Sequence, residues 1–195
     1  MRRKRMAVSD YLYYITVALL CFAIAGMLAL MISMDSLELY EGRFKGISMN
    51  PTLYEGETGT FRTKGYQLSH GDIVTFWCGS FGKELCKRVI GLPGDTIELL
   101  GDKVYRNGEA LEEPYIIPCT YNDGSEPQVW HVEEDHIFVM GDNRPASIDS
   151  RAEEVGQIAL GNVHGEYFYA GSGFPIVEVL KAGLLHIEPP SLTGA

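Results

Sequence analysis

A serine and a lysine stand in sequence contexts that suit nucleophilic chemistry. Ser48 lies in Gly-Ile-Ser-Met-Asn-Pro-Thr, and Lys87 lies among apolar neighbours in Leu-Cys-Lys-Arg-Val-Ile. A serine hydroxyl is a weak nucleophile until a base removes its proton. Lysine can be that base only when neutral, which near pH 7–8 requires its pKa to fall by about 3 units from ~10.4, a cost of about 4 kcal/mol. Burial among apolar side chains supplies such a shift, although a lysine in a strand beside an arginine is, taken alone, more often solvated.

Signatures of other hydrolytic mechanisms are missing from the sequence. No serine lies in a G-x-S-x-G elbow, and neither an H-E-x-x-H motif nor a glycine-rich phosphate loop occurs. The histidines are scattered, and His131 and His136 are spaced so that a strand or turn would direct them to different faces. We therefore expect no metal site and no cofactor.

Three segments resemble, in order, the sequence boxes of bacterial type I signal peptidases. The segment 46–53 is similar to their nucleophile box S-M-x-P-T, and Lys-Arg-Val-Ile-Gly-Leu-Pro-Gly-Asp at 87–95 is similar to their lysine box. The segment 141–151, Gly-Asp-Asn-Arg-Pro-Ala-Ser-Ile-Asp-Ser-Arg, resembles their third box, G-D-N-R-x-x-S-x-D-S-R. The similarity covers roughly residues 10–170. It implies a membrane-bound serine endopeptidase that removes N-terminal signal peptides from exported preproteins.

The resemblance assigns roles to individual residues of these boxes. It implies that Ser48 is the nucleophile and that Lys87 is the general base, which later protonates the leaving amine. The Ser48 backbone N–H would contribute to the oxyanion hole. Some members of the family add a serine hydroxyl two residues earlier, where this chain has Gly46, so it matches the glycine-containing branch and its second oxyanion donor stays open. Ser147 matches the serine that orients the lysine amine.

Further positions match residues that support the site or bind substrate. Four charged residues are expected to form structural ion pairs that hold the third box against the lysine strand: Arg88, Asp142, Asp149 and Arg151. Family members bind the end of a signal peptide as an added strand, and shallow pockets accept small residues in an A-x-A pattern. The matching pocket positions are Phe44, Met49, Leu53 and Cys86. Phe44 and Leu53 are equally compatible with a plain core role.

The N-terminal region has the composition of a membrane anchor. Residues 1–10 include Arg-Arg-Lys-Arg, and residues 11–33 then run without a charge. As a helix, such a segment spans roughly 34 Å, enough for a hydrocarbon core of about 30 Å. It is too long for a cleavable signal peptide and lacks a clean cleavage site. The positive-inside rule places the N-terminus in the cytoplasm and the rest outside the cell membrane, so the phospholipid bilayer is an expected partner.

The expected extracytoplasmic domain covers residues 36–187 and is acidic. Of 16 basic and 26 acidic residues, 4 and 2 precede Ser36, which leaves a net charge of −12 beyond it. Such a surface repels phosphate backbones, so we expect no nucleic-acid binding. We interpret 173–187 as a strand or surface helix, too short and too charged for a second span, and 188–195 as a flexible tail.

Short β-rich segments separated by turns predict a mainly β, antiparallel catalytic domain with a small inserted β subdomain at about 97–132. Alternation predicts an extended run at 43–48, ended by Pro51. A hairpin is expected around Gly79-Ser-Phe-Gly82, and further strands are expected at 96–100, 103–105, 136–140 and 163–168. A tight turn is expected at Asn107-Gly108, and residues 112–130 look irregular.

Cysteine pairing stays open at the sequence level. Cys78 and Cys86 flank the expected hairpin turn and either form a disulfide across it or remain free thiols. A role of Cys86 in lining the substrate pocket would make it less free to bond Cys78.

Two other functions share much of this evidence. One is a Ser/Lys peptidase of the same clan with a narrow client list, such as a pilin-processing or sporulation-specific enzyme, which unrelated preproteins would distinguish. The other is a catalytically inactive, membrane-tethered peptide-binding module, in which replacing Ser48 would change no cleavage.

Overall fold

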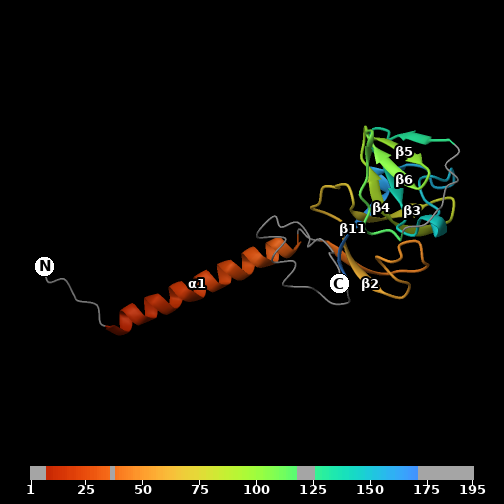
Figure 1. The fold of residues 1–195 in the computed structure, drawn as a ribbon. Helices are drawn as coiled ribbons and strands as arrows, with labels where there is room; N and C mark the ends of the chain where they lie inside the picture. Colours follow the sequence, from red (N-terminus) through yellow and green to blue (C-terminus); the bar gives the residue numbers. More distant parts are fainter. Residues whose placement is uncertain (1–7, 36–37, 118–125, 171–195) are drawn as a thin grey trace. The chain divides into compact units, whose positions relative to one another are not determined.

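The structure is a computed structural model that describes residues 8–35, 38–117 and 126–170. It divides into two compact units, one at the N-terminus and one that begins at Leu39. In the first, α1 (Val8–Asp35) is a single helix (Figure 1). Its segment Tyr11–Ala29 has a mean hydropathy of 2.2 and is long and apolar enough to cross a membrane. None of that segment is buried against other described residues, and a helix that is apolar on all sides is typical of a core helix or a membrane span.

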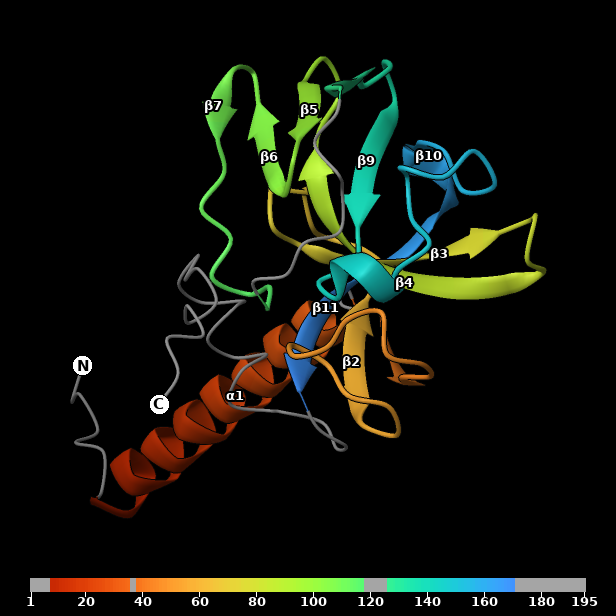
Figure 2. The same cartoon turned by 45° about the vertical axis from the view of Figure 1, so that its right-hand side comes forward.

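The second unit is built from antiparallel strands (Figure 2). The larger sheet has seven strands in the order β1-β2-β11-β3-β4-β9-β10, and the smaller has four in the order β7-β6-β5-β8. The bounds are β1 Leu39–Arg43, β2 Thr58–Arg62, β3 Ile73–Cys78, β4 Lys83–Gly91, β5 Thr96–Leu100, β6 Lys103–Arg106, β7 Glu109–Ala110, β8 Gln128–His131, β9 His136–Met140, β10 Ile158–Ala159 and β11 Val163–Ala170. Two 3₁₀ turns, η1 (Arg144–Ala146) and η2 (Leu160–Asn162), complete it. The mainly antiparallel β architecture with an N-terminal helix is confirmed.

The strongest sequence signals correspond to strands in the structure. The expected hairpin is formed by β3 and β4 around the four-residue turn 79–82, and β9 has the predicted bounds. Asn107 and Gly108 join β6 to β7 with φ values of 54° and 83°. Positive φ at both central residues is the requirement of a type I′ turn, which Asn-Gly meets at low cost.

The extended run predicted at 43–48 is wrong. β1 ends at Arg43, and Ser48 lies on a turn. The chain turns where Gly46 adopts a φ of +83°, a conformation that disfavours any residue with a Cβ. In addition, β8 occupies the end of a stretch expected to be irregular.

The two sheets share a hydrophobic core. Ile90, Phe138 and Met140 of the larger sheet pack with Ile97 and Leu99 of β5, and Val104 and Val132 complete the cluster. β4, which carries Lys87, and β9, which runs into the third box, are therefore fixed from the side of the smaller sheet. The segments expected at 173–187 and 188–195 lie outside the described residues.

Candidate active site

The Ser48 loop is anchored on its downstream side by apolar side chains. Met49 and Leu53 are 4% and 5% exposed and belong to one buried cluster with Phe44, Phe61 and Ile73. The Leu53 N–H donates to the Met49 carbonyl over 3.0 Å. Ser48 therefore follows β1 on a turn whose C-terminal half is fixed by burial.

Lys87 reaches Ser48 from β4. Its Nζ lies 2.8 Å from Ser48 Oγ and also donates to the Cys86 carbonyl over 2.9 Å. Lys87 is only 2% exposed. Burial lowers the pKa of the Lys87 amine, and the weaker influence of the Asp149 carboxylate, which favours the charged form, does not reverse that direction. The structure thus brings the two sequence-predicted catalytic residues together.

Ser147 lies beside this site but forms no hydrogen bond with the amine. It follows η1, and its buried Oγ has no hydrogen-bond partner among the described residues. Any side-chain carbon at Gly141 would clash with Ser147 Oγ and with the Ser48 carbonyl oxygen, so the three residues are in close packing. The hydrogen bond expected from Ser147 to the Lys87 amine is not formed here, and the orienting role of Ser147 stays a prediction.

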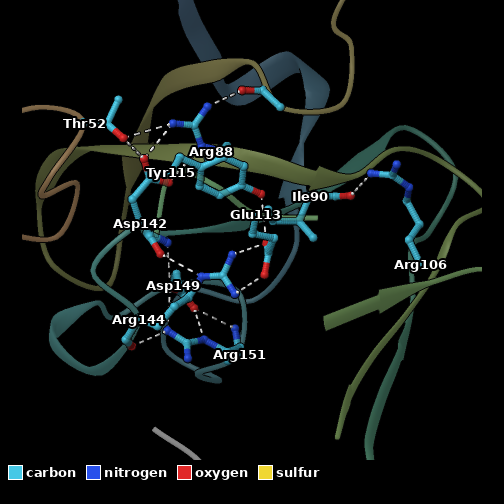
Figure 3. Close-up of polar contacts among 12 residues, drawn as sticks. Thr52, Arg88, Ile90, Arg106, Glu113, Tyr115, Asp142, Arg144, Asp149 and Arg151 are labelled. Carbon is cyan, nitrogen blue, oxygen red and sulfur yellow. Dashed lines mark hydrogen bonds and ion pairs between the residues drawn. The ribbon is translucent and has the colours of Figure 1, made fainter. Parts of the chain in front are cut away.

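The four charged residues that the resemblance singles out form two ion pairs (Figure 3). Arg88 donates to both oxygens of Asp142, over 2.8 and 2.6 Å, and Asp142 also accepts from the Thr52 hydroxyl. Arg151 donates to both oxygens of Asp149, over 2.7 and 2.8 Å, while Asp149 accepts the Gly141 N–H over 2.9 Å. These contacts hold the third box against β4 and against the Ser48 loop.

Sequence reasoning missed a second buried contact to this region. Arg144 forms a buried ion pair with both oxygens of Glu113 and donates to the Gly141 carbonyl over 3.1 Å. Tyr115 donates to Glu113 over 2.8 Å, and its ring lies 4.1 Å from the Arg88 guanidinium. Figure 3 shows these side chains packed between the two arginine–aspartate pairs. Arg144 belongs to a recognised box, but Glu113 and Tyr115 come from a stretch with no periodic signal.

The residues expected to line the substrate pocket lie near the nucleophile, but most of them are buried in the hydrophobic core. Phe44 is 8% exposed and is packed edge-on to Phe61, 5.9 Å between ring centroids. Cys86 packs against the same cluster and is half-buried. Burial raises the pKa of the Cys86 thiol to about 12, so it is neutral and unreactive at ordinary pH. Their part in substrate selection stays a prediction.

A Cys78–Cys86 disulfide is not formed. In the β3–β4 register Cys78 pairs with Lys83, and Cys86 pairs with Thr75. An offset of three residues separates the two Cα atoms by about 10 Å at 3.4 Å per residue, beyond the range of roughly 4.4–6.8 Å for disulfides. It also directs the thiols to opposite faces, and both are free.

The histidines singled out in the sequence make separate contacts. His131 Nδ1 lies 3.0 Å from Thr96 Oγ1, and His136 Nδ1 lies 2.9 Å from the Glu134 carbonyl. Among the described residues, no group of three His, Cys, Asp or Glu side chains is placed to hold a metal ion.

Comparisons with known proteins agree on one family. The profile of the family described as "Signal peptidase, peptidase S26" matches residues 15–170. The chain is 37% identical to "Signal peptidase I" of Bacillus licheniformis over 142 residues, covering 66% of this chain and 73% of the relative. It is 35% identical to "Signal peptidase IB" of Staphylococcus aureus strain COL over 126 residues, covering 55% and 65%. A crystal structure of a signal peptidase I from Enterococcus faecalis V583 is 32% identical, covers 51% of this chain and 96% of that chain, and has a TM-score of 0.45.

Proposed function

The chain belongs to the signal peptidase family, peptidase S26, and we propose that it is a serine endopeptidase whose nucleophile is Ser48 and whose general base is Lys87. Its function is that of a signal peptidase I. The observation that carries the dyad is the 2.8 Å separation of Lys87 Nζ and Ser48 Oγ at an amine that is 2% exposed.

The proposed reaction follows from the protonation state of Lys87. Because burial disfavours the ammonium form, the amine is neutral over more of the physiological pH range and can accept the Ser48 proton. Ser48 Oγ then attacks the scissile carbonyl, and the Ser48 N–H donates to the oxygen that becomes negative. The Lys87 ammonium returns its proton to the leaving amine, which releases the mature protein. Water, activated by the same amine, hydrolyses the acyl-enzyme.

An unpaired strand edge supports binding of an extended substrate. On one side β4 pairs with β3 along Lys83–Arg88, but on the other it pairs with β9 only from Arg88 onward. Within the described residues, the edge of β4 from Lys83 to Lys87 therefore has no neighbouring strand on that side. We infer that the end of a signal peptide pairs with this edge next to Ser48. Small residues in the A-x-A pattern would face the cluster of Phe44, Met49, Leu53 and Cys86.

The helix α1 supports attachment to the cell membrane. We propose that it spans the bilayer once, with basic residues 2–5 in the cytoplasm and the β unit outside. In this arrangement the protease shares a membrane surface with the signal peptides of exported preproteins. Concentrating enzyme and substrate in one plane raises the rate of encounter.

Single substitutions at the dyad test the proposed mechanism. Ser48→Ala and Lys87→Ala should each abolish cleavage of a preprotein with an A-x-A site by the full-length protein in detergent. Ser80→Ala and Lys45→Ala are matched controls, because both residues are exposed, and they should cleave normally. Wild-type turnover in either dyad variant, with the fold intact by circular dichroism, would refute the Ser/Lys mechanism.

A further inference from the structure

Asn143 forms hydrogen bonds to both peptide groups that flank the Ser48 Cα. Its side-chain Nδ2 donates to the Ile47 carbonyl over 3.1 Å, and its backbone N–H donates to the Ser48 carbonyl over 3.0 Å. The amide must face Ile47 with its NH₂ group, because a carbonyl oxygen only accepts. One residue of the third box therefore holds the peptide before the nucleophile and the peptide after it.

The side-chain contact fixes the direction of a backbone donor. The Ile47–Ser48 peptide is trans, so its C=O and its N–H point in opposite directions within one rigid plane. Holding the Ile47 oxygen therefore sets where the Ser48 N–H points. Among the described residues nothing accepts a hydrogen bond from that N–H, which leaves it free for a substrate oxygen. Asn143 Nδ2 binds the C=O edge of this peptide, opposite the edge that carries the N–H, so it positions the donor without touching the substrate.

The upstream half of the loop has few other constraints. Ile47 is 51% exposed, and a Cβ placed on Gly46 would meet no atom within 4 Å. The Gly46 N–H donates to Glu55 over 3.3 Å at an exposed site. Downstream, by contrast, Met49 and Leu53 are buried. The peptide that carries the oxyanion donor is therefore held by hydrogen bonds rather than by packing. The Ile47 carbonyl accepts from Asn143 Nδ2 and, over 3.1 Å, from the Asn50 N–H of the same turn, so Asn143 supplies the contact that comes from outside the loop.

We propose that Asn143 is a positioning residue that orients the Ser48 N–H as the oxyanion donor. This inference rests on the proposed Ser48 mechanism and adds the residue that pre-organises it. A fixed donor lowers the barrier because no reorganisation is needed as charge develops on the substrate oxygen. The contribution matters here because the position two residues before the nucleophile is Gly46, which offers no hydroxyl as a second donor.

The test uses Asn143→Ala and Asn143→Asp in the full-length protein. Asn143→Asp keeps the size of the side chain but sets a carboxylate oxygen against the Ile47 carbonyl. Both variants retain the backbone N–H contact to Ser48, so only the side-chain contact is lost. We expect kcat to fall roughly ten- to hundred-fold, below the 10²–10³ typical of deleting a donor, with KM nearly unchanged. Asn162→Ala, at an exposed asparagine of η2, is the matched control and should behave as wild type.

Three readouts separate positioning from a structural role. The affinity for a peptide aldehyde, whose adduct with Ser48 places an oxyanion at the donor, should fall in parallel with kcat, while the affinity for an uncleavable peptide is kept. The Tm should change little, since water can replace the amide at this exposed contact. The pH profile should keep its apparent pKa, because Lys87 is untouched.

The outcomes distinguish this inference from the proposed function. Unchanged kcat in both variants, or a rise in KM alone, would overturn the role of Asn143 and leave the dyad standing. A shifted pH profile with a lowered Tm would also overturn it, by showing a general disturbance of the site. Full activity of Ser48→Ala would overturn the proposed mechanism itself, whatever the Asn143 variants do.

Discussion

The guanidinium of Arg88 binds the carboxylate of Asp142 through two parallel hydrogen bonds, and Asp142 is almost completely buried. Arg88 follows Lys87 on β4, and Asp142 is the second residue of the third box. The same carboxylate accepts from Thr52, which belongs to the Ser48 loop. One ion pair therefore connects the three segments that meet at the dyad, and the separation of Ser48 and Lys87 depends on it.

Removing one partner of this pair should cost stability as well as activity. Asp142→Ala leaves the Arg88 charge partly buried without a counter-ion, for which a loss of about 3–5 kcal/mol is typical. Urea unfolding should show that loss, and cleavage should fall with it. Arg88→Lys keeps the charge but not the bidentate geometry, so a smaller loss is expected. If the urea midpoint of unfolding is the same for Asp142→Ala and wild type, the ion pair does not hold the three segments together.

Gly141 should tolerate no side chain. A methyl group there would clash with Ser147 Oγ and the Ser48 carbonyl, and one of those atoms belongs to the backbone of the nucleophile loop. We expect Gly141→Ala to lower kcat/KM at least a hundred-fold, about 2.7 kcal/mol of transition-state stabilisation. Gly161→Ala is the matched control, because a Cβ at Gly161 meets no atom within 4 Å. Comparable activity in the two variants would contradict the close packing at Gly141.

The cysteines give a direct test of the β3–β4 register. Peptide mapping without reductant should find no link between Cys78 and Cys86. Cys86 should react with iodoacetamide at pH 8 far more slowly in the native protein than in urea, because burial raises its pKa to about 12. A recovered Cys78–Cys86 peptide would show that the strands pair differently.

The buried amine should make stability depend on pH. The pKa of Lys87 in the folded state is below its unfolded value of about 10.4, so the unfolded chain binds more protons between those two values. The free energy of unfolding contributed by Lys87 therefore rises with pH across that window. Lys87→Met should have a higher Tm than wild type near pH 6–7, and the difference should shrink toward pH 10.

An exposed lysine on another strand serves as the control for that experiment. Lys103 begins β6 and is exposed, so the Tm difference between Lys103→Met and wild type should be small and similar from pH 6 to pH 10. A Tm difference for Lys87→Met that is constant from pH 6 to pH 10 would mean that the amine is not held neutral by burial.

The sequence predicted the parts of the fold that local patterns specify. β3 and β9 are runs rich in β-branched and aromatic residues, Gly79 and Gly82 mark the hairpin turn between β3 and β4, and Asn107-Gly108 is a turn signal in itself. Ser48 and Lys87 were identified from the boxes around them. The short distance between Ser48 Oγ and Lys87 Nζ could not be predicted from the sequence, because it depends on a turn at Gly46 and on the packing of β4 against two neighbouring strands.

The features that the sequence missed or left open share a physical cause. Alternation at 43–48 suggested a strand, but the tertiary contacts of Met49 and Leu53 fix a turn there instead. Glu113 and Tyr115 reach Arg144 and Arg88 from a stretch without periodicity, so only long-range pairing could identify them. Cys78 and Cys86 are near in sequence, yet strand register and side-chain alternation separate them.

The most direct test of the account is the pH dependence of kcat/KM for a preprotein or short peptide substrate between pH 5 and pH 10. If the neutral Lys87 amine is the base, kcat/KM should rise along a single limb to a plateau, with an apparent pKa well below the ~10.4 of free lysine. A rate independent of pH over this range, or a limb centred near the value of free lysine, would contradict it.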